Sequence, residues 1–138
     1  MKIFSVILAA LFFSLSAEAN EAKVSSAKEH VKKQTKSGKG QLEIFAKGKN
    51  AFFAKLSLAP GAKVPLHKDA TEEYLYILSG KGRISINGKW SEINAGSSVY
   101  MPAGAEVTFE NGDLELIAIQ VFAGPGPSKK YDKWVLKK

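Results

Sequence analysis

The sequence predicts an all-β fold, built as an antiparallel sandwich or a closed barrel. Short runs rich in β-branched and aromatic residues recur at even spacing, and no helical periodicity lies between them. Turn signals such as Asn87-Gly88 and Asn111-Gly112 separate the runs. Because Asn-Gly between two such runs is the strongest short hairpin signal, consecutive strands are expected to pair antiparallel.

The first 19 residues have the pattern of a secretory signal peptide. Lys2 precedes an apolar run over residues 3–15, and Ala17 and Ala19 form an A-x-A cleavage signal. The run is shorter than the roughly 20 apolar residues of a membrane-spanning helix, so a retained anchor is the weaker alternative. We expect cleavage after Ala19, no membrane span in the mature protein, and a periplasmic or secreted location.

Residues 20–40 are expected to form a short helix followed by a linker. Apolar residues recur at helical spacing between positions 21 and 35 and are surrounded by lysines. This stripe consists of Val24, Ala27 and Val31. Residues 37–40, Ser-Gly-Lys-Gly, would end the helix. His30 lies among lysines, and we expect it to be exposed and not a ligand.

The barrel is expected over residues 41–122, where turns divide the chain into short extended segments. The expected strands are residues 42–46, 52–58, 73–78, 83–86, 89–93, 98–101, 106–109 and 114–122. Residues 73–78 and 114–122 are apolar on both faces, whereas a sheet with one face in water would alternate. A terminal segment or a second subunit should therefore cover the outer face.

Residues 123–138 are expected to form a C-terminal tail that packs on the barrel. Pro125 and Pro127 lie among glycines and cannot continue a strand. Tyr131, Trp134 and Leu136 are then expected to cover apolar barrel surface. An aromatic clamp over the mouth of a ligand pocket is the alternative.

Composition limits the class of protein and its partners. The chain has 138 residues with 45% hydrophobic content, which is enough for one domain with a real core. Its net charge of +7 comes almost entirely from lysine, since Arg83 is the only arginine. Lysine is a strongly hydrated point charge, so a solvated surface is expected and a nucleic-acid partner is not. There is no cysteine, and the fold must be stable without disulfides.

One stretch carries the candidate chemistry. Between Gly61 and Gly80 lie His67, Asp69 and Glu73, which share the same parity in an otherwise apolar region. Side chains two residues apart on a strand point to the same face. The three polar groups are therefore expected to point together into an enclosed space.

The spacing of these residues resembles the first motif of the cupin family, G-x5-H-x-H-x3-E-x6-G, from Gly61 to Gly80. The segment from Gly96 through Pro102 and Gly104 to Asn111 is similar to the second motif, G-x5-P-x-G-x2-H-x3-N. The resemblance covers most of the chain and implies a double-stranded β-helix, the jelly-roll barrel of small bacterial cupins. It also implies a homodimer that forms through a sheet face.

The chain departs from the family at two metal positions. Metal-binding cupins usually supply three histidines and a glutamate, and only His67 and Glu73 match that set. Asp69 replaces the second histidine, and Val107 replaces the third with a side chain that cannot bind an ion. The resemblance thus implies a degenerate metal site, formed by His67, Asp69 and Glu73.

Three alternatives remain for this cluster. It can hold a weakly bound divalent metal, for which an oxygen-rich set favours iron(II) or manganese. Without metal, His67 or Glu73 can move a proton as a general acid or base. The third alternative is a hydrogen-bonded polar remnant with no chemistry.

The barrel interior is the expected small-molecule site. Tyr100, Gln120 and Val107 are candidates to line it; Gln120 interrupts an apolar strand and would need a hydrogen-bond partner if it faced inward. The sequence therefore predicts an exported cupin that binds a small polar molecule such as a sugar or an organic acid. The alternative is a small enzyme, either an iron- or manganese-dependent oxygenase-like protein or a metal-free isomerase, epimerase or lyase.

Overall fold

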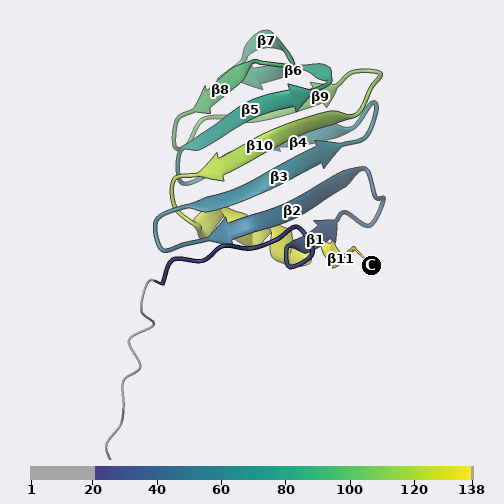
Figure 1. Cartoon of the computed structure of the whole chain (residues 1–138). Coiled ribbons are helices and arrows are strands. Elements are labelled where there is room, and N and C mark those ends of the chain that lie inside the picture. The colour runs from purple at the N-terminus through teal and green to yellow at the C-terminus, as the bar shows by residue number, and fades with distance from the viewer. Residues whose placement is uncertain (1–20, 138) are drawn as a thin grey trace, which may run out of the picture.

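Two antiparallel sheets face each other in the computed structural model, which describes residues 21–137 (Figure 1). The signal peptide expected over residues 1–19 lies outside the described residues. The larger sheet has the order β11 (Val135–Leu136), β1 (Val31–Gln34), β2 (Gly40–Lys47), β3 (Phe52–Leu58), β10 (Leu116–Phe122), β5 (Glu73–Ser79), β8 (Ser98–Met101). The smaller has the order β4 (Lys63–His67), β9 (Val107–Asn111), β6 (Lys81–Ile86), β7 (Lys89–Asn94). The predicted all-β fold is confirmed.

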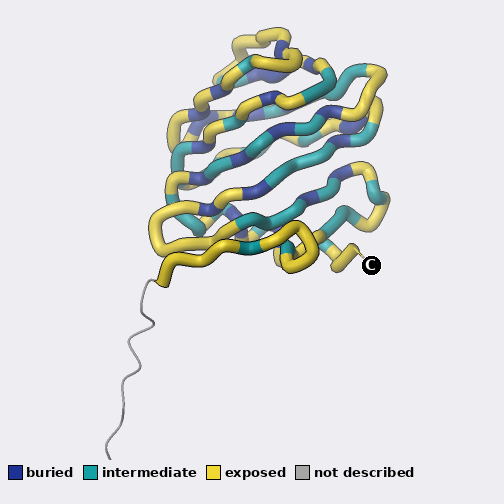
Figure 2. The backbone as a smooth tube through the Cα atoms, in the orientation of Figure 1, coloured by how far each residue is buried: buried dark blue, intermediate teal, exposed yellow. Residues whose placement is uncertain are grey.

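The main core lies between the two sheets. Burial alternates along β10, where Leu116, Ala118, Gln120 and Phe122 are buried while the residues between them are half-buried, and Figure 2 shows this alternation along the strands. From the smaller sheet, Ile84, Val107 and Phe109 join the same core cluster.

A second apolar cluster joins the C-terminal tail to the larger sheet. The tail forms a 3-10 helix, η1 (Gly126–Lys133), whose Tyr131 packs with Phe52 and Phe122 at ring-centroid distances of 5.9 and 6.5 Å. Trp134 contacts Tyr131 edge-on at 5.0 Å. Leu136, in contrast, is 69% exposed in β11 and covers no core surface.

The helix expected between residues 21 and 35 is wrong. Residues 21–26 have no regular secondary structure, residues 27–30 form a turn, and β1 follows, pairing with both β2 and β11. Val24, from the predicted apolar stripe, is 98% exposed. Isolated helices of this length are marginal in water, so strand pairing on both sides of β1 outweighs a thin stripe.

His30 also differs from the expectation of an exposed side chain. Its Nδ1 lies 2.9 Å from Glu43 Oε1 on β2, and its ring packs 4.9 Å from that of Phe45. Only 13% of the His30 side chain is exposed. The residue thus joins the turn before β1 to the sheet, as a structural contact rather than a ligand.

Two residues of the sequence motifs hold the backbone in place. Asn111 donates from Nδ2 to the carbonyl oxygens of Leu58, Ala59 and Leu114, at 2.8 to 3.0 Å. Gly80 has a positive φ of 85°, and a Cβ there would lie 2.7 Å from Leu116 Cα. Only glycine fits that position without displacing backbone.

The outer face of the larger sheet carries a row of exposed apolar side chains. Phe53, Tyr74, Tyr76, Leu78 and Tyr100 are each between 40% and 51% exposed. We call these five residues the outer patch. Within residues 21–137, no helix has the length and apolar character needed to cross a membrane.

Candidate functional site

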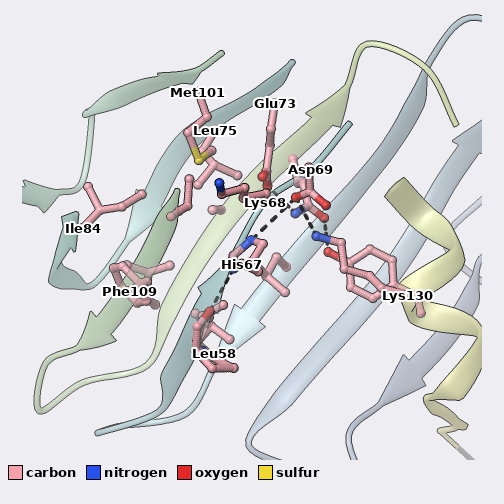
Figure 3. Close-up of a pocket in the computed structure, with 18 of the residues that line it drawn as sticks. Leu58, His67, Lys68, Asp69, Glu73, Leu75, Ile84, Met101, Phe109 and Lys130 are labelled. Carbon is pink, nitrogen blue, oxygen red and sulfur yellow. Dashed lines mark hydrogen bonds and ion pairs between the residues drawn. The ribbon is translucent and has the colours of Figure 1, made fainter. Parts of the chain in front are cut away.

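A cavity of about 450 Å³ lies between the two sheets (Figure 3). Most of its wall is apolar, and its polar side chains come from the β4–β5 region, from β10 and from η1. The apolar lining is Leu56, Leu58, Val64, Pro65, Leu75, Ile84, Met101, Val107, Phe109, Leu116, Ala118 and Trp134. The polar lining is His67, Lys68, Asp69, Glu73, Gln120, Lys130 and Tyr131.

The three residues of the first motif meet in this cavity. His67 ends β4, Asp69 follows in the loop, and Glu73 begins β5, so a short connection brings them together. The Asp69 carbonyl accepts a 2.7 Å hydrogen bond from the Gly104 backbone N–H, which holds the loop against the second motif. One potential ligand atom from each of the three side chains lies within 4.8 Å of the others.

The imidazole of His67 is oriented by the backbone. Its Nδ1 lies 2.9 Å from the Pro65 carbonyl oxygen and must donate to it, since a carbonyl only accepts. In the neutral ring this leaves a lone pair on Nε2, which lies 3.5 Å from Asp69 Oδ2. The neighbouring Asp69 carboxylate raises the pKa of His67, although burial opposes that shift.

Lys130, which the sequence reasoning missed, belongs to the same cluster. Its Nζ donates to Asp69 Oδ2 at 2.7 Å from η1, 61 residues further along the chain. Burial alone would raise the pKa of Asp69, but hydrogen bonds from His67 and Lys130 outweigh it and lower the pKa. The sequence carries no sign of this contact, because Lys130 is one of several lysines in the tail.

Glu73 is held by a second chain of hydrogen bonds. Gln120 Nε2 donates to Glu73 Oε1 at 2.6 Å, and Gln120 Oε1 accepts from the Tyr131 hydroxyl at 2.8 Å. All three residues are buried. Burial raises the pKa of Glu73, with the Gln120 hydrogen bond acting in the opposite direction.

The three expected lining residues have different positions. Gln120 faces the cavity with both ends of its amide bonded, and Val107 lines the wall directly opposite His67 in the β4–β9 pairing. For Tyr100 the expectation is wrong. It belongs to the outer patch, is 51% exposed, and donates to Glu72 Oε1 at 2.9 Å, because its position in β8 points to the outer face.

The ligand atoms of the cluster, their existing hydrogen bonds and the valine opposite His67 bear on whether a divalent ion fits. His67 Nε2 and the two carboxylates could supply one nitrogen and oxygen ligands, the set that suits manganese or iron(II). However, the Asp69 oxygen already accepts from an ammonium, and Glu73 Oε1 from an amide. Val107 adds no ligand where it faces His67. An ion bound to either of these two oxygens would have to displace a contact that the chain makes by itself.

Comparison with known proteins shows the family of this chain. Residues 54–122 match the cupin domain. The oxalate-binding protein of Thermotoga maritima is 38% identical over 93 residues, which cover 59% of this chain and 77% of that relative. The chain therefore belongs to the cupin family, as the two motifs predicted.

Solved structures agree with this fold. A predicted oxalate decarboxylase of Thermotoga maritima is 29% identical, with a TM-score of 0.61, and covers 74% of this chain and 99% of its own. An RmlC-like cupin of Shewanella frigidimarina has a TM-score of 0.67, covering 75% of this chain and 92% of its own. At 15% identity, the second structure supports the fold alone.

Replacing Tyr131 with phenylalanine tests the buried network. Loss of the hydroxyl leaves Gln120 Oε1 without its donor, so the free energy of unfolding is expected to fall by about 1–3 kcal/mol. Tyr76→Phe on the outer patch is the control, with an expected change within about 0.5 kcal/mol. Urea denaturation measures both, and equal stability of the two variants would contradict the network.

Proposed function

We propose that the protein is an exported cupin that binds a small organic acid in the barrel cavity. The observation that supports this most directly is the composition of the cavity wall. Its basic groups are Lys130, the half-buried His67 and Lys68, whose exposed side chain is paired with Glu106, while the rest of the wall is mostly apolar. A carboxylate can be held by such cations, and an apolar body can occupy the remaining space.

The size of the cavity agrees with a small ligand. A volume of about 450 Å³ lies in the usual range for small-molecule sites, roughly 300–1,000 Å³. The carboxylates of Asp69 and Glu73 both have hydrogen-bond partners from the chain, so neither is left as a bare charge beside an acidic ligand. The name of the oxalate-binding relative agrees with an organic acid as the ligand class.

A thermal-shift screen tests the ligand class. We expect oxalate, malonate or benzoate to raise the melting temperature of the purified protein, because a ligand that prefers the folded state stabilises it. Neutral sugars of similar size should have less effect. Val107→Phe fills the cavity wall and should abolish the shift, whereas Leu114→Phe, at an exposed loop position, should preserve it.

The screen also separates binding from the enzyme alternative. If none of these acids shifts the wild-type protein, the organic-acid proposal is wrong.

His67 and Glu73 lie on one wall of the cavity with raised pKa values, the arrangement that general acid and base catalysis requires. Consumption of a bound acid, followed by NMR and lost in His67→Gln, would favour an enzyme.

Export is proposed from the signal-peptide pattern of residues 1–19. When the full chain is produced in a Gram-negative host, we expect the protein in the periplasmic fraction or the medium, with an N-terminus at Asn20. N-terminal sequencing by mass spectrometry measures this. A cytoplasmic product that retains Met1 would contradict it.

A homodimer through the outer patch is proposed as the assembly. The patch crosses β3, β5 and β8, and Tyr74 and Tyr100 lie 5.3 Å apart with both hydroxyls donating to Glu72. Aromatic side chains of this kind dominate protein interfaces. A terminal segment was the other expected cover, but within residues 21–137 all five patch residues remain exposed.

Sedimentation velocity tests the dimer. We expect the wild-type protein to sediment as a dimer and Tyr76→Lys to shift it to monomer, because a lysine at the centre of an apolar interface would lose its hydration without a partner. Leu114→Lys, at a loop outside the patch, is the control and should remain dimeric. A monomeric wild-type protein, or an unchanged Tyr76→Lys dimer, would contradict the assembly.

A further inference from the structure

The positive charge in the cavity cluster comes from the chain itself. Lys130 Nζ lies 2.7 Å from Asp69 Oδ2, and the same oxygen lies 3.5 Å from His67 Nε2. The Asp69 side chain is only 14% exposed, so its charge requires a close partner. We propose that Lys130 takes the place of a divalent ion in this cavity: it balances the carboxylate charge and contacts the acid group of the ligand.

Lys130 is positioned by the fold rather than left as a free surface lysine. It lies between two buried residues of η1, Ser128 and Tyr131, and its Nζ lies 4.9 Å from the centre of the Phe122 ring. An aromatic face attracts an ammonium and restricts where it can go. The neighbouring Lys129 is exposed and does not line the cavity, and Lys68, which does, pairs with Glu106, so of these three lysines only Lys130 pairs with Asp69.

An ammonium and a divalent ion compete for the same oxygen. Two cations bound to Asp69 Oδ2 would lie within about 5 Å of each other, a separation at which like charges repel strongly in a protein. Glu73 offers little compensation, because Gln120 already occupies its Oε1. With Val107 opposite His67, no third histidine offsets this cost. An ion at Asp69 Oδ2 therefore has to displace Lys130, and an ion at the other oxygen of the same carboxylate is still repelled by the ammonium.

The same ammonium has capacity left for a ligand. A lysine carries three N–H donors, and one of them is used by Asp69 while Nζ lies in the cavity wall (Figure 3). A second donor can reach an incoming carboxylate, and His67 in its protonated form can add another. The contact between Lys130 and a ligand carboxylate rests on the proposed function, whereas the competition between Lys130 and a metal ion does not.

Metal titration tests the first part of the proposal, that Lys130 takes the place of a divalent ion at Asp69. Mn²⁺ is titrated by calorimetry into the wild-type protein, Lys130→Met and Lys129→Met, which removes one charge from the same helix outside the cavity. We expect Lys130→Met to bind Mn²⁺ at least about tenfold more tightly than the wild type, because Asp69 is freed and the repulsion is removed. Lys129→Met should match the wild type. Equal or weaker binding by Lys130→Met would overturn the proposal.

Two further variants guard against a folding defect. If Lys130→Met does not fold without metal, Lys130→Gln, which can still donate to Asp69 but carries no charge, takes its place in the comparison. Tighter Mn²⁺ binding than in the wild type is again expected, because the charge repulsion is removed. Adding Asp69→Asn to either variant should remove most of the gain in Mn²⁺ affinity, because Asp69 supplies the freed oxygen. A gain that survives Asp69→Asn would place the ion elsewhere and overturn the proposal.

The second part of the proposal, that Lys130 contacts the acid group of the ligand, is tested with oxalate and benzoate as probes. The thermal shift that either acid causes in the wild-type protein should be unchanged by EDTA and should be lost in Lys130→Met, while Lys129→Met keeps it. A shift that EDTA abolishes would overturn this part. If neither acid shifts the wild-type protein, the proposed function fails, and the Mn²⁺ comparison still decides the first part.

Discussion

The ion pair between Lys130 and Asp69 connects the C-terminal helix to the polar cluster of the cavity. Asp69 belongs to the loop after β4, and Lys130 to the 3-10 helix that follows the last long strand. Its neighbour Tyr131 reaches Glu73 through Gln120. The two carboxylates are thus stabilised by adjacent residues of one helical turn. Without the tail, both acids would face an apolar chamber with far fewer partners, at a considerable desolvation cost.

The packing of the C-terminal tail on the larger sheet positions this ion pair. The buried aromatic rings of Phe52, Phe122 and Tyr131 fix the helix against the larger sheet, and this apolar contact positions the ammonium. Stability and site geometry therefore come from the same cluster. A barrel that ended at residue 122 would lack β11 at the edge of the larger sheet and the part of the cavity wall that Lys130, Tyr131 and Trp134 supply.

Much of the fold was predictable because its signals are local. The Asn87-Gly88 hairpin and the glycine with positive φ at position 80 each follow from turn or backbone chemistry. The convergence of His67, Asp69 and Glu73 followed from motif spacing.

Lys130 was not predictable, because a contact across 61 residues leaves no periodic pattern. The N-terminal helix failed partly for the same reason, because β1 pairs not only with the adjacent β2 but also with β11 near the other end of the chain. Tyr100 failed because a short strand with apolar residues on both faces does not indicate which one is inside.

The central claim is that an ammonium of the chain occupies the place of a metal, and a crystal grown in millimolar Mn²⁺ tests it most directly. Anomalous diffraction at the manganese edge locates the ion without prior assumptions. We expect no anomalous peak among His67, Asp69 and Glu73, with Lys130 Nζ still within hydrogen-bond distance of Asp69. A fully occupied peak at that position, with Lys130 turned away from Asp69, would contradict it.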